Sequence, residues 1–129
     1  MGLFPFGASP ALELQATTGE AGFALQDATP NILTWTAPAD GNLHRFMVFF
    51  YCYVTSALTG GQINLQFKDP LGNTVIQTFL GASQGSGSHG TTDPGYLIMI
   101  VASGQEVILS QESAVTAGAG IIWAELWGA

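Results

Sequence analysis

The chain has very few charged side chains and almost no positive charge. Only 9% of its 129 residues are charged, and the two cations, Arg45 and Lys68, stand against nine acids for a net charge of −7. Two cationic side chains cannot neutralise a run of phosphates, so neither nucleic acids nor anionic membranes are expected partners. The chain is nevertheless 47% hydrophobic, which predicts a folded domain with a buried core.

Cysteine occurs once, at Cys52, which excludes an internal disulfide and a cysteine-cluster metal site. Cys52 lies in an apolar segment and is expected to be a small buried hydrophobe. The sequence opens without a basic stretch and a continuous apolar run, which argues against a secretory signal. Its longest uncharged apolar run, residues 46–54, is far shorter than the roughly 20 residues of a membrane-spanning helix. These observations predict a protein made in a reducing cytoplasm.

A sustained helical period is also missing. Turn signals separate short segments that are rich in β-branched and aromatic residues, which predicts an all-β fold, an antiparallel β-sandwich or barrel. The predicted strands are 13–17, 22–28, 32–36, 43–55, 62–68, 74–80, 95–102, 105–111 and 120–127. The glycine- and serine-rich segment Gly81–Gly95 is predicted to be a loop. The expected organisation is an extended N-terminal arm, residues 1–19, followed by one domain, residues 20–129.

Three of the predicted strands are apolar on both faces. In the strand 43–55, the even-numbered residues from Phe46 to Val54 point one way and the odd-numbered residues from Met47 to Tyr53 point the other. A two-layer sandwich covers only the inner face of each sheet from within. An uncovered aromatic outer face would exceed the few hundred Å² of apolar patch that monomers usually expose.

Two alternatives remain for what covers this outer face. One is the N-terminal arm of the same chain, folded back, and the other is a neighbouring subunit. We favour the subunit, because obligate interfaces are rich in aromatic residues and methionine and because ring symmetry closes such an assembly. The residues predicted to form the subunit interface are Met47, Phe49, Tyr51, Tyr53, Tyr96, Trp123, Glu125 and Trp127.

Three segments resemble the C1q/TNF-like jelly-roll domain. Residues 33–48, with Pro38, Asp40-Gly41 and Phe46, are similar to that family's Pro-x-Asp-Gly segment and the strand after it. Residues 104–109 and 118–126 resemble two of its later strands, with Gln105 and Ala119 where the family usually has Asp and an aromatic residue. The resemblance implies a jelly-roll sandwich that assembles as a compact homotrimer through its aromatic sheet.

Among proteins of that kind, the chain looks most like the small trimeric β-domains of bacteriophage virions. This likeness implies a capsid decoration (cement) protein, made in the host cytoplasm and located on the capsid exterior of the virion. Its expected partners are further copies of itself and the major capsid protein, which it would grip through an anchor in the arm: Leu3, Phe4 and Phe6. The alternative is a fibre-tip or lectin-like module that binds host glycans through the 81–95 loop and exposed tryptophans.

The sequence shows no set of residues arranged as a catalytic site. Gly81–Gly85 matches Gly-x-Ser-x-Gly and Gly85–Gly90 matches Gly-x-Gly-x-x-Gly, but neither is followed by the helix that these motifs need. His89 and Asp93 lie in the same loop, and two ligands are too few for a metal site. The prediction is a protein that is not an enzyme and that uses no metal and no cofactor.

Single polar and aromatic residues carry the remaining expectations. His44, at the start of an apolar strand, is expected at the surface or in a subunit contact, where assembly would depend on pH near its ordinary pKa. Glu125 is expected to accept hydrogen bonds from Arg45, from a neighbour's tryptophan or from water, and to set the subunit register. We expect the three tryptophans to pack in the core or at an interface: Trp35, Trp123 and Trp127. A sugar-stacking platform is the alternative.

Overall fold

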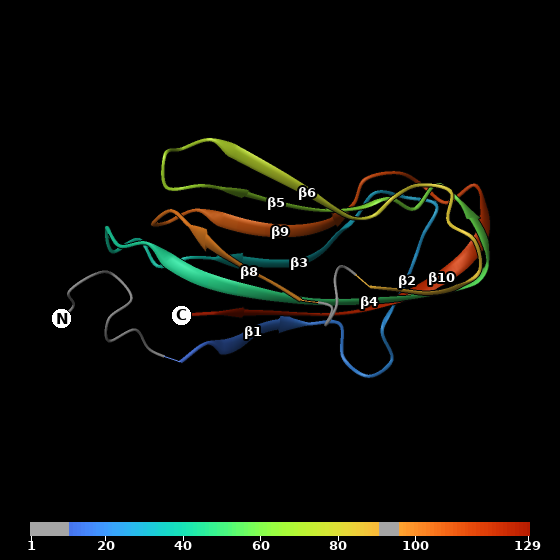
Figure 1. Cartoon of the computed structure of the whole chain (residues 1–129), viewed down its shortest axis with the longest axis horizontal. Coiled ribbons are helices and arrows are strands. Elements are labelled where there is room, and N and C mark those ends of the chain that lie inside the picture. The colour runs from blue at the N-terminus through green and yellow to red at the C-terminus, as the bar shows by residue number, and fades with distance from the viewer. Residues whose placement is uncertain (1–10, 91–95) are drawn as a thin grey trace.

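The computed structural model describes residues 11–90 and 96–129, and over these residues the protein is all-β (Figure 1). Two antiparallel sheets pack face to face, so the prediction of an antiparallel β-sandwich is confirmed. The described strands are β1 (Glu13–Thr17), β2 (Phe23–Ala24), β3 (Asn31–Thr36), β4 (His44–Thr59), β5 (Ile63–Lys68), β6 (Thr74–Leu80), β7 (Gly87–Gly90), β8 (Tyr96–Val101), β9 (Glu106–Gln111) and β10 (Ala117–Gly128).

The larger sheet has six strands and the smaller sheet four. In the six-stranded sheet the order is β1-β10-β4-β7, β2 also pairs with β10, and β8 also pairs with β4. The four-stranded sheet has the order β3-β9-β5-β6 and lies above the other in Figure 1. The two longest strands, β4 and β10, pair side by side over most of their length, with Tyr51 opposite Trp123 near the middle. The centre of the six-stranded sheet is therefore built from segments about half a chain apart.

The core lies between the sheets and follows from the alternation of β4. The even-numbered residues of this strand point inward and are buried: Phe46, Val48, Phe50, Cys52 and Val54. From the four-stranded sheet, Phe67 meets Phe46 edge-on with ring centroids 5.0 Å apart, and Phe79 meets Phe50 at 5.5 Å. Edge-on and tilted aromatic pairs of this kind add specific geometry to the burial of apolar area.

The predicted strands agree with the structure except near some ends. β1 and β6 have the predicted bounds, 13–17 and 74–80. β2 keeps only two residues of the predicted segment 22–28, whereas β4 continues to Thr59 and β10 begins already at Ala117. Local patterns locate a strand well but not its last residues, which depend on the partner strand.

The prediction of a loop throughout 81–95 is wrong in part. Residues 87–90 form β7, which pairs with β4 from Tyr51 to Val54. Its sequence, Gly-Ser-His-Gly, has low intrinsic strand preference, so the sequence alone hides it. The strand forms because the edge of β4 offers unpaired backbone groups that need partners.

The predicted arm divides into two parts. Residues 13–17 form β1, which pairs with β10 at the edge of the six-stranded sheet. The predicted anchor residues Leu3, Phe4 and Phe6 lie outside the described residues, as does Asp93 in the 91–95 segment.

Candidate interaction surface

The outer face of the six-stranded sheet carries large apolar side chains that the described chain leaves partly uncovered. Tyr51 and Tyr53 of β4 are each 45% exposed and Phe49 is 37% exposed. Three further side chains on this side are half-buried: Met47 of β4 and Trp123 and Trp127 of β10. We call the six the aromatic face: Met47, Phe49, Tyr51, Tyr53, Trp123 and Trp127.

Cross-strand pairing extends the aromatic face to both sides. Met47 lies opposite Trp127 on one side and opposite Ile98 of β8 on the other, and Leu14 of β1 lies opposite Trp127. Directly paired residues of antiparallel strands project to the same side of the sheet. These four residues therefore form one apolar row across four strands, and its two ends, Leu14 and Ile98, are exposed.

The middle of the aromatic face is a tyrosine–tryptophan pair. The rings of Tyr51 and Trp123 lie 5.7 Å apart with their planes tilted by 41°. The Tyr51 hydroxyl forms a hydrogen bond of 2.6 Å with the Ser88 hydroxyl of β7, and the Trp123 indole N–H donates to the Glu20 carbonyl at 2.8 Å. The polar atoms of both rings thus have partners within the chain, and what remains exposed is mostly ring surface.

Glu125 is the acid of this face and lies between the two tryptophans of β10. The indole N–H of Trp127, from the same chain, donates to its carboxylate at 3.2 Å. In the β4–β10 register Glu125 lies opposite Phe49. By the alternation of β4, Arg45 projects from the same side of the sheet, opposite Ile100 of β8. One acid and one base therefore accompany the apolar side chains of β4 and β10.

The structure brings the predicted interface residues of β4 and β10 together on one face. The backbone of Tyr96 lies opposite Phe49, while its side chain is not among those described. The residue pattern did not single out Leu14 and Ile98 as members of the apolar row. Their signal was their place in strands predicted at 13–17 and 95–102, but only the register puts them beside Trp127 and Met47.

Trp35 does not belong to this face. It lies on β3 of the four-stranded sheet and packs against the core. Its ring approaches β10 so closely that a Cβ built on Gly128 would lie 2.6 Å from it. A sugar-stacking platform made of all three tryptophans is therefore wrong, because the core separates Trp35 from the other two.

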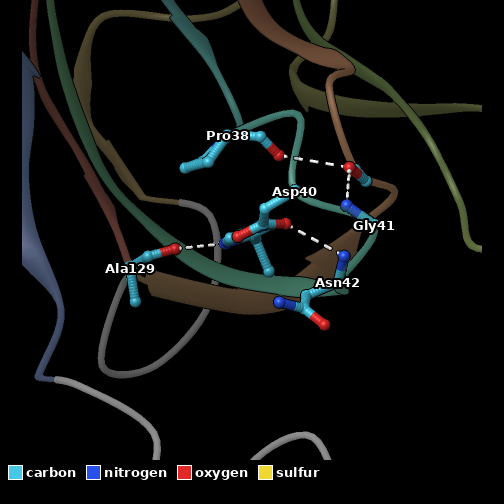
Figure 2. A network of polar contacts seen from close by, with 7 residues as sticks. Pro38, Asp40, Gly41, Asn42 and Ala129 are labelled. Carbon is cyan, nitrogen blue, oxygen red and sulfur yellow. Dashed lines mark hydrogen bonds and ion pairs between the residues drawn. The ribbon is translucent and has the colours of Figure 1, made fainter.

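His44 is buried, so the prediction of a surface position for it is wrong. Its Nε2 lies 2.9 Å from a carboxylate oxygen of Asp40, and its Nδ1 lies 2.5 Å from the carbonyl oxygen of Ala129. Figure 2 shows this network, in which the Asn42 amide also donates to Asp40. Burial lowers the pKa of His44, but the hydrogen bonds to Asp40 and Ala129 and the charge of Asp40 together raise it above 6.5. The hydrogen bond from His44 in turn lowers the pKa of Asp40.

Cys52 is buried in the core, as predicted. Burial raises the pKa of its thiol to about 11, so the reactive thiolate is scarce at neutral pH. His89 has a ring nitrogen 3.0 Å from the Gly85 carbonyl oxygen. In residues 11–90 and 96–129 no three His, Cys, Asp or Glu side chains gather as metal ligands. Over the same residues there is no helix with the length and apolar character to cross a membrane.

Comparison with known proteins found no family model that matches this chain and no curated protein that matches its sequence. The aromatic face is thus the feature on which a functional assignment can be built.

Proposed function

We propose that this protein is a structural, non-enzymatic β-sandwich whose copies cover one another's aromatic faces. The observation that carries the proposal is the partial exposure of the large side chains of the aromatic face, with Tyr51 and Tyr53 each 45% exposed. Covering the exposed half of one such side chain contributes on the order of 1 kcal/mol. At a contact between two copies the side chains of both aromatic faces contribute, so the gain is of the same order as the entropic cost of binding.

We further propose a homotrimer with jelly-roll topology. The chain crosses repeatedly from one sheet to the other, which supports this topology. The four-stranded sheet contains β3, β5, β6 and β9, and the strands that alternate with them along the chain, β4, β7, β8 and β10, lie in the six-stranded sheet. The resemblance to C1q/TNF-like domains, which assemble as trimers through an aromatic sheet, favours three copies around one axis.

The biological role that we propose is decoration of a bacteriophage head. A trimer that binds the assembled shell and not its free subunits stabilises the shell by mass action. The net charge of −7 would keep decorated particles soluble and apart. In this proposal the major capsid protein is the partner, the capsid exterior is the location, and the segment with Leu3, Phe4 and Phe6 is the anchor.

Self-association is tested with two matched substitutions. We expect the unmodified protein to be a trimer by native mass spectrometry and sedimentation velocity at micromolar concentration. Tyr53→Glu places a charge in the aromatic face and is expected to give monomers, because a buried unpaired carboxylate is costly. Ile76→Glu is the control, since Ile76 is 58% exposed on β6 of the other sheet, and it is expected to leave the trimer intact. A monomeric unmodified protein, or equal behaviour of the two variants, would contradict the proposal.

The partner is tested separately with undecorated phage heads. The trimer is expected to sediment with the heads and to raise the temperature at which they open. A variant without residues 1–10 is expected to remain trimeric and to stay in the supernatant. Full-length trimer that also stays in the supernatant would argue against decoration while leaving self-association standing.

A second candidate function is glycan binding by a fibre-tip or lectin-like module. The observation that favours it is the exposed Tyr51 ring, tilted against Trp123 and bonded to the Ser88 hydroxyl of β7. Aromatic rings beside hydroxyl groups suit the apolar and polar faces of a sugar ring. Titration of tryptophan fluorescence with a panel of sugars separates the candidates, because saturable quenching is expected only of a glycan-binding protein.

A further inference from the structure

The contacts of His44 place a proton-dependent link at one end of the sandwich. The ring joins the turn before β4, through Asp40, to the end of β10, through Ala129, which lies 85 residues further along the chain. The turn itself is held from the other side, because the Gly41 amide donates to the Ser103 hydroxyl at 2.8 Å and that hydroxyl donates to the Pro38 carbonyl at 3.2 Å (Figure 2).

Both partners of the ring are acceptors only. A carboxylate oxygen and a carbonyl oxygen carry no proton, so each of the two ring nitrogens of His44 must donate for both bonds to form. Neutral imidazole has one N–H and imidazolium has two. The arrangement of Asp40, His44 and Ala129 is therefore satisfied by the protonated ring alone.

We propose that His44 is a proton-operated clamp that holds the end of β10 against the turn before β4 and releases it when the ring loses a proton. The neutral ring keeps one N–H and therefore only one of the two hydrogen bonds, which breaks the link between the turn and the end of β10. The bare nitrogen then faces an acceptor oxygen, and two acceptors repel. What holds Ala129 after release is its amide, which donates to the Arg45 carbonyl at 3.3 Å.

Few other charged groups lie on the elements around the ring. In β4 the next residue, Arg45, points to the opposite side of the sheet. β8, which pairs with this end of β4, has only apolar residues over 98–101, and the 102–105 turn carries no charge. On β1, Glu13 lies opposite Gly128, next to Ala129. The other charged residues of the neighbouring strand ends lie in the four-stranded sheet or its turns: Lys68, Asp69 and Glu106. Asp40 is the acid bonded to the ring, and it favours the protonated state.

The direction of the effect follows from linkage. The folded-state pKa of His44 is raised above 6.5, so the stabilisation by the clamp is complete below that pH and is lost as the pH rises through the raised value. At the acid side, the pKa of Asp40 is lowered from 3.8, so its contribution persists until the pH falls below that value. The clamp is therefore closed below pH 6.5 and opens as the pH rises through the raised pKa of His44.

The clamp bears on the aromatic face. Trp127 lies two residues before Ala129 in β10, and Met47, opposite Trp127, lies three residues after His44 in β4. Loosening the end of β10 disturbs this corner of the face, so copies should associate more weakly when the clamp is open. This regulatory consequence rests on the proposed function, whereas the clamp itself does not.

The clamp is tested by NMR on the protein with its two histidines, His44 and His89. We expect the His44 ring to titrate above its ordinary value of 6.5. Amide exchange of Ala129, relative to the Ala102 amide, is expected to rise several-fold with the same midpoint. In Asp40→Asn the midpoint should move to lower pH, and in His44→Gln the pH step at Ala129 should vanish. A His44 ring that titrates at or below its ordinary value, or an Ala129 amide indifferent to that titration, would overturn the clamp.

The link to assembly is measured by sedimentation of the unmodified protein and His44→Gln at about pH 5.5 and pH 8.5, on either side of the histidine range. A rising pH makes the net charge more negative and so opposes association by itself. The signal is therefore the additional several-fold weakening found only with His44. If the clamp titrates and both proteins are monomeric at both pH values, the proposed function fails and the clamp stands. Equal pH dependence in two assembling proteins would overturn the regulatory link alone.

Discussion

At the scale of the residue, the buried side chain of Gln111 links two segments of the chain by hydrogen bonds. It is the last residue of β9 and is 1% exposed. Its side-chain carbonyl accepts a hydrogen bond from the backbone N–H of Gln26 at 3.0 Å. Its side-chain NH2 group donates to the backbone carbonyls of Gln26 and Ser113. Three hydrogen bonds of one side chain thus hold the segment after β2 to the end of the four-stranded sheet. Glutamine is usually exposed, so nothing in the sequence singled out this residue.

Gln111→Met tests this function of the side chain. Methionine has a similar volume but leaves the amide and the carbonyl of Gln26 without their partner, so we expect the free energy of unfolding to fall by about 2–3 kcal/mol. Urea denaturation measures the change. Gln77→Met, at an exposed position of β6, is the control and should change stability by less than about 0.5 kcal/mol. Equal effects of the two substitutions would mean that the three hydrogen bonds contribute nothing net.

At the scale of the element, β10 needs a glycine to stay paired with β4. The register shifts between Ala117 and Ala119, and Gly118 between them has φ +84°. A Cβ at this position would lie 2.1 Å from the Ala57 carbonyl oxygen. Extra residues of this kind bend a strand and increase its twist, and glycine is the residue that allows the backbone to approach so closely. The first part of β10 therefore depends on this one residue.

Gly118→Ala and Gly72→Ala form a matched pair that separates backbone strain from steric clash. Both glycines have φ near the same positive value, +84° and +83°, but nothing lies within 4 Å of a Cβ at Gly72. We expect Gly72→Ala to lower the free energy of unfolding by about 1 kcal/mol through φ alone. Gly118→Ala should lower it by at least about 3 kcal/mol, because the clash adds to the strain. Chemical denaturation measures the free energy of unfolding of both variants. Similar losses would show that β10 shifts to relieve the clash at residue 118 without a further loss of stability.

At the scale of the whole molecule, the two sheets differ in what they show to the outside. The six-stranded sheet presents the aromatic face, whereas the outer side of the four-stranded sheet has exposed polar residues such as Gln66 and Thr78 besides Ile76. A net charge of −7 opposes close approach of copies except where large apolar area is buried. This difference between the two sheets supports the proposed association through one side.

The proposed association through one side would make thermal stability depend on protein concentration. Because the assembled state contains folded chains only, we expect the melting temperature of the unmodified protein to rise as its concentration rises. Tyr53→Glu should melt at a temperature that does not change with concentration, and Ile76→Glu should behave like the unmodified protein. Differential scanning calorimetry over a wide concentration range measures this. A flat response of the unmodified protein would argue that the aromatic face stays uncovered in solution.

The sequence by itself determined the strand content and much of the core. Alternation in β4 predicted which side chains, from Phe46 to Val54, point inward, and it placed Met47 to Tyr53 on the other face. It also predicted Cys52 to be buried. These features are local: a strand has a period of two, and turn residues act on their own backbone.

Tertiary structure decided what depends on distant partners. β7 exists because the edge of β4 accepts it, and Trp35 packs on Gly128 because the two sheets meet there. The two acceptors that surround His44 come from residues 4 and 85 positions away, and the sequence pattern revealed neither. Chain topology brings such groups together, and burial then makes each hydrogen bond between them matter, because a buried polar group without a partner is costly.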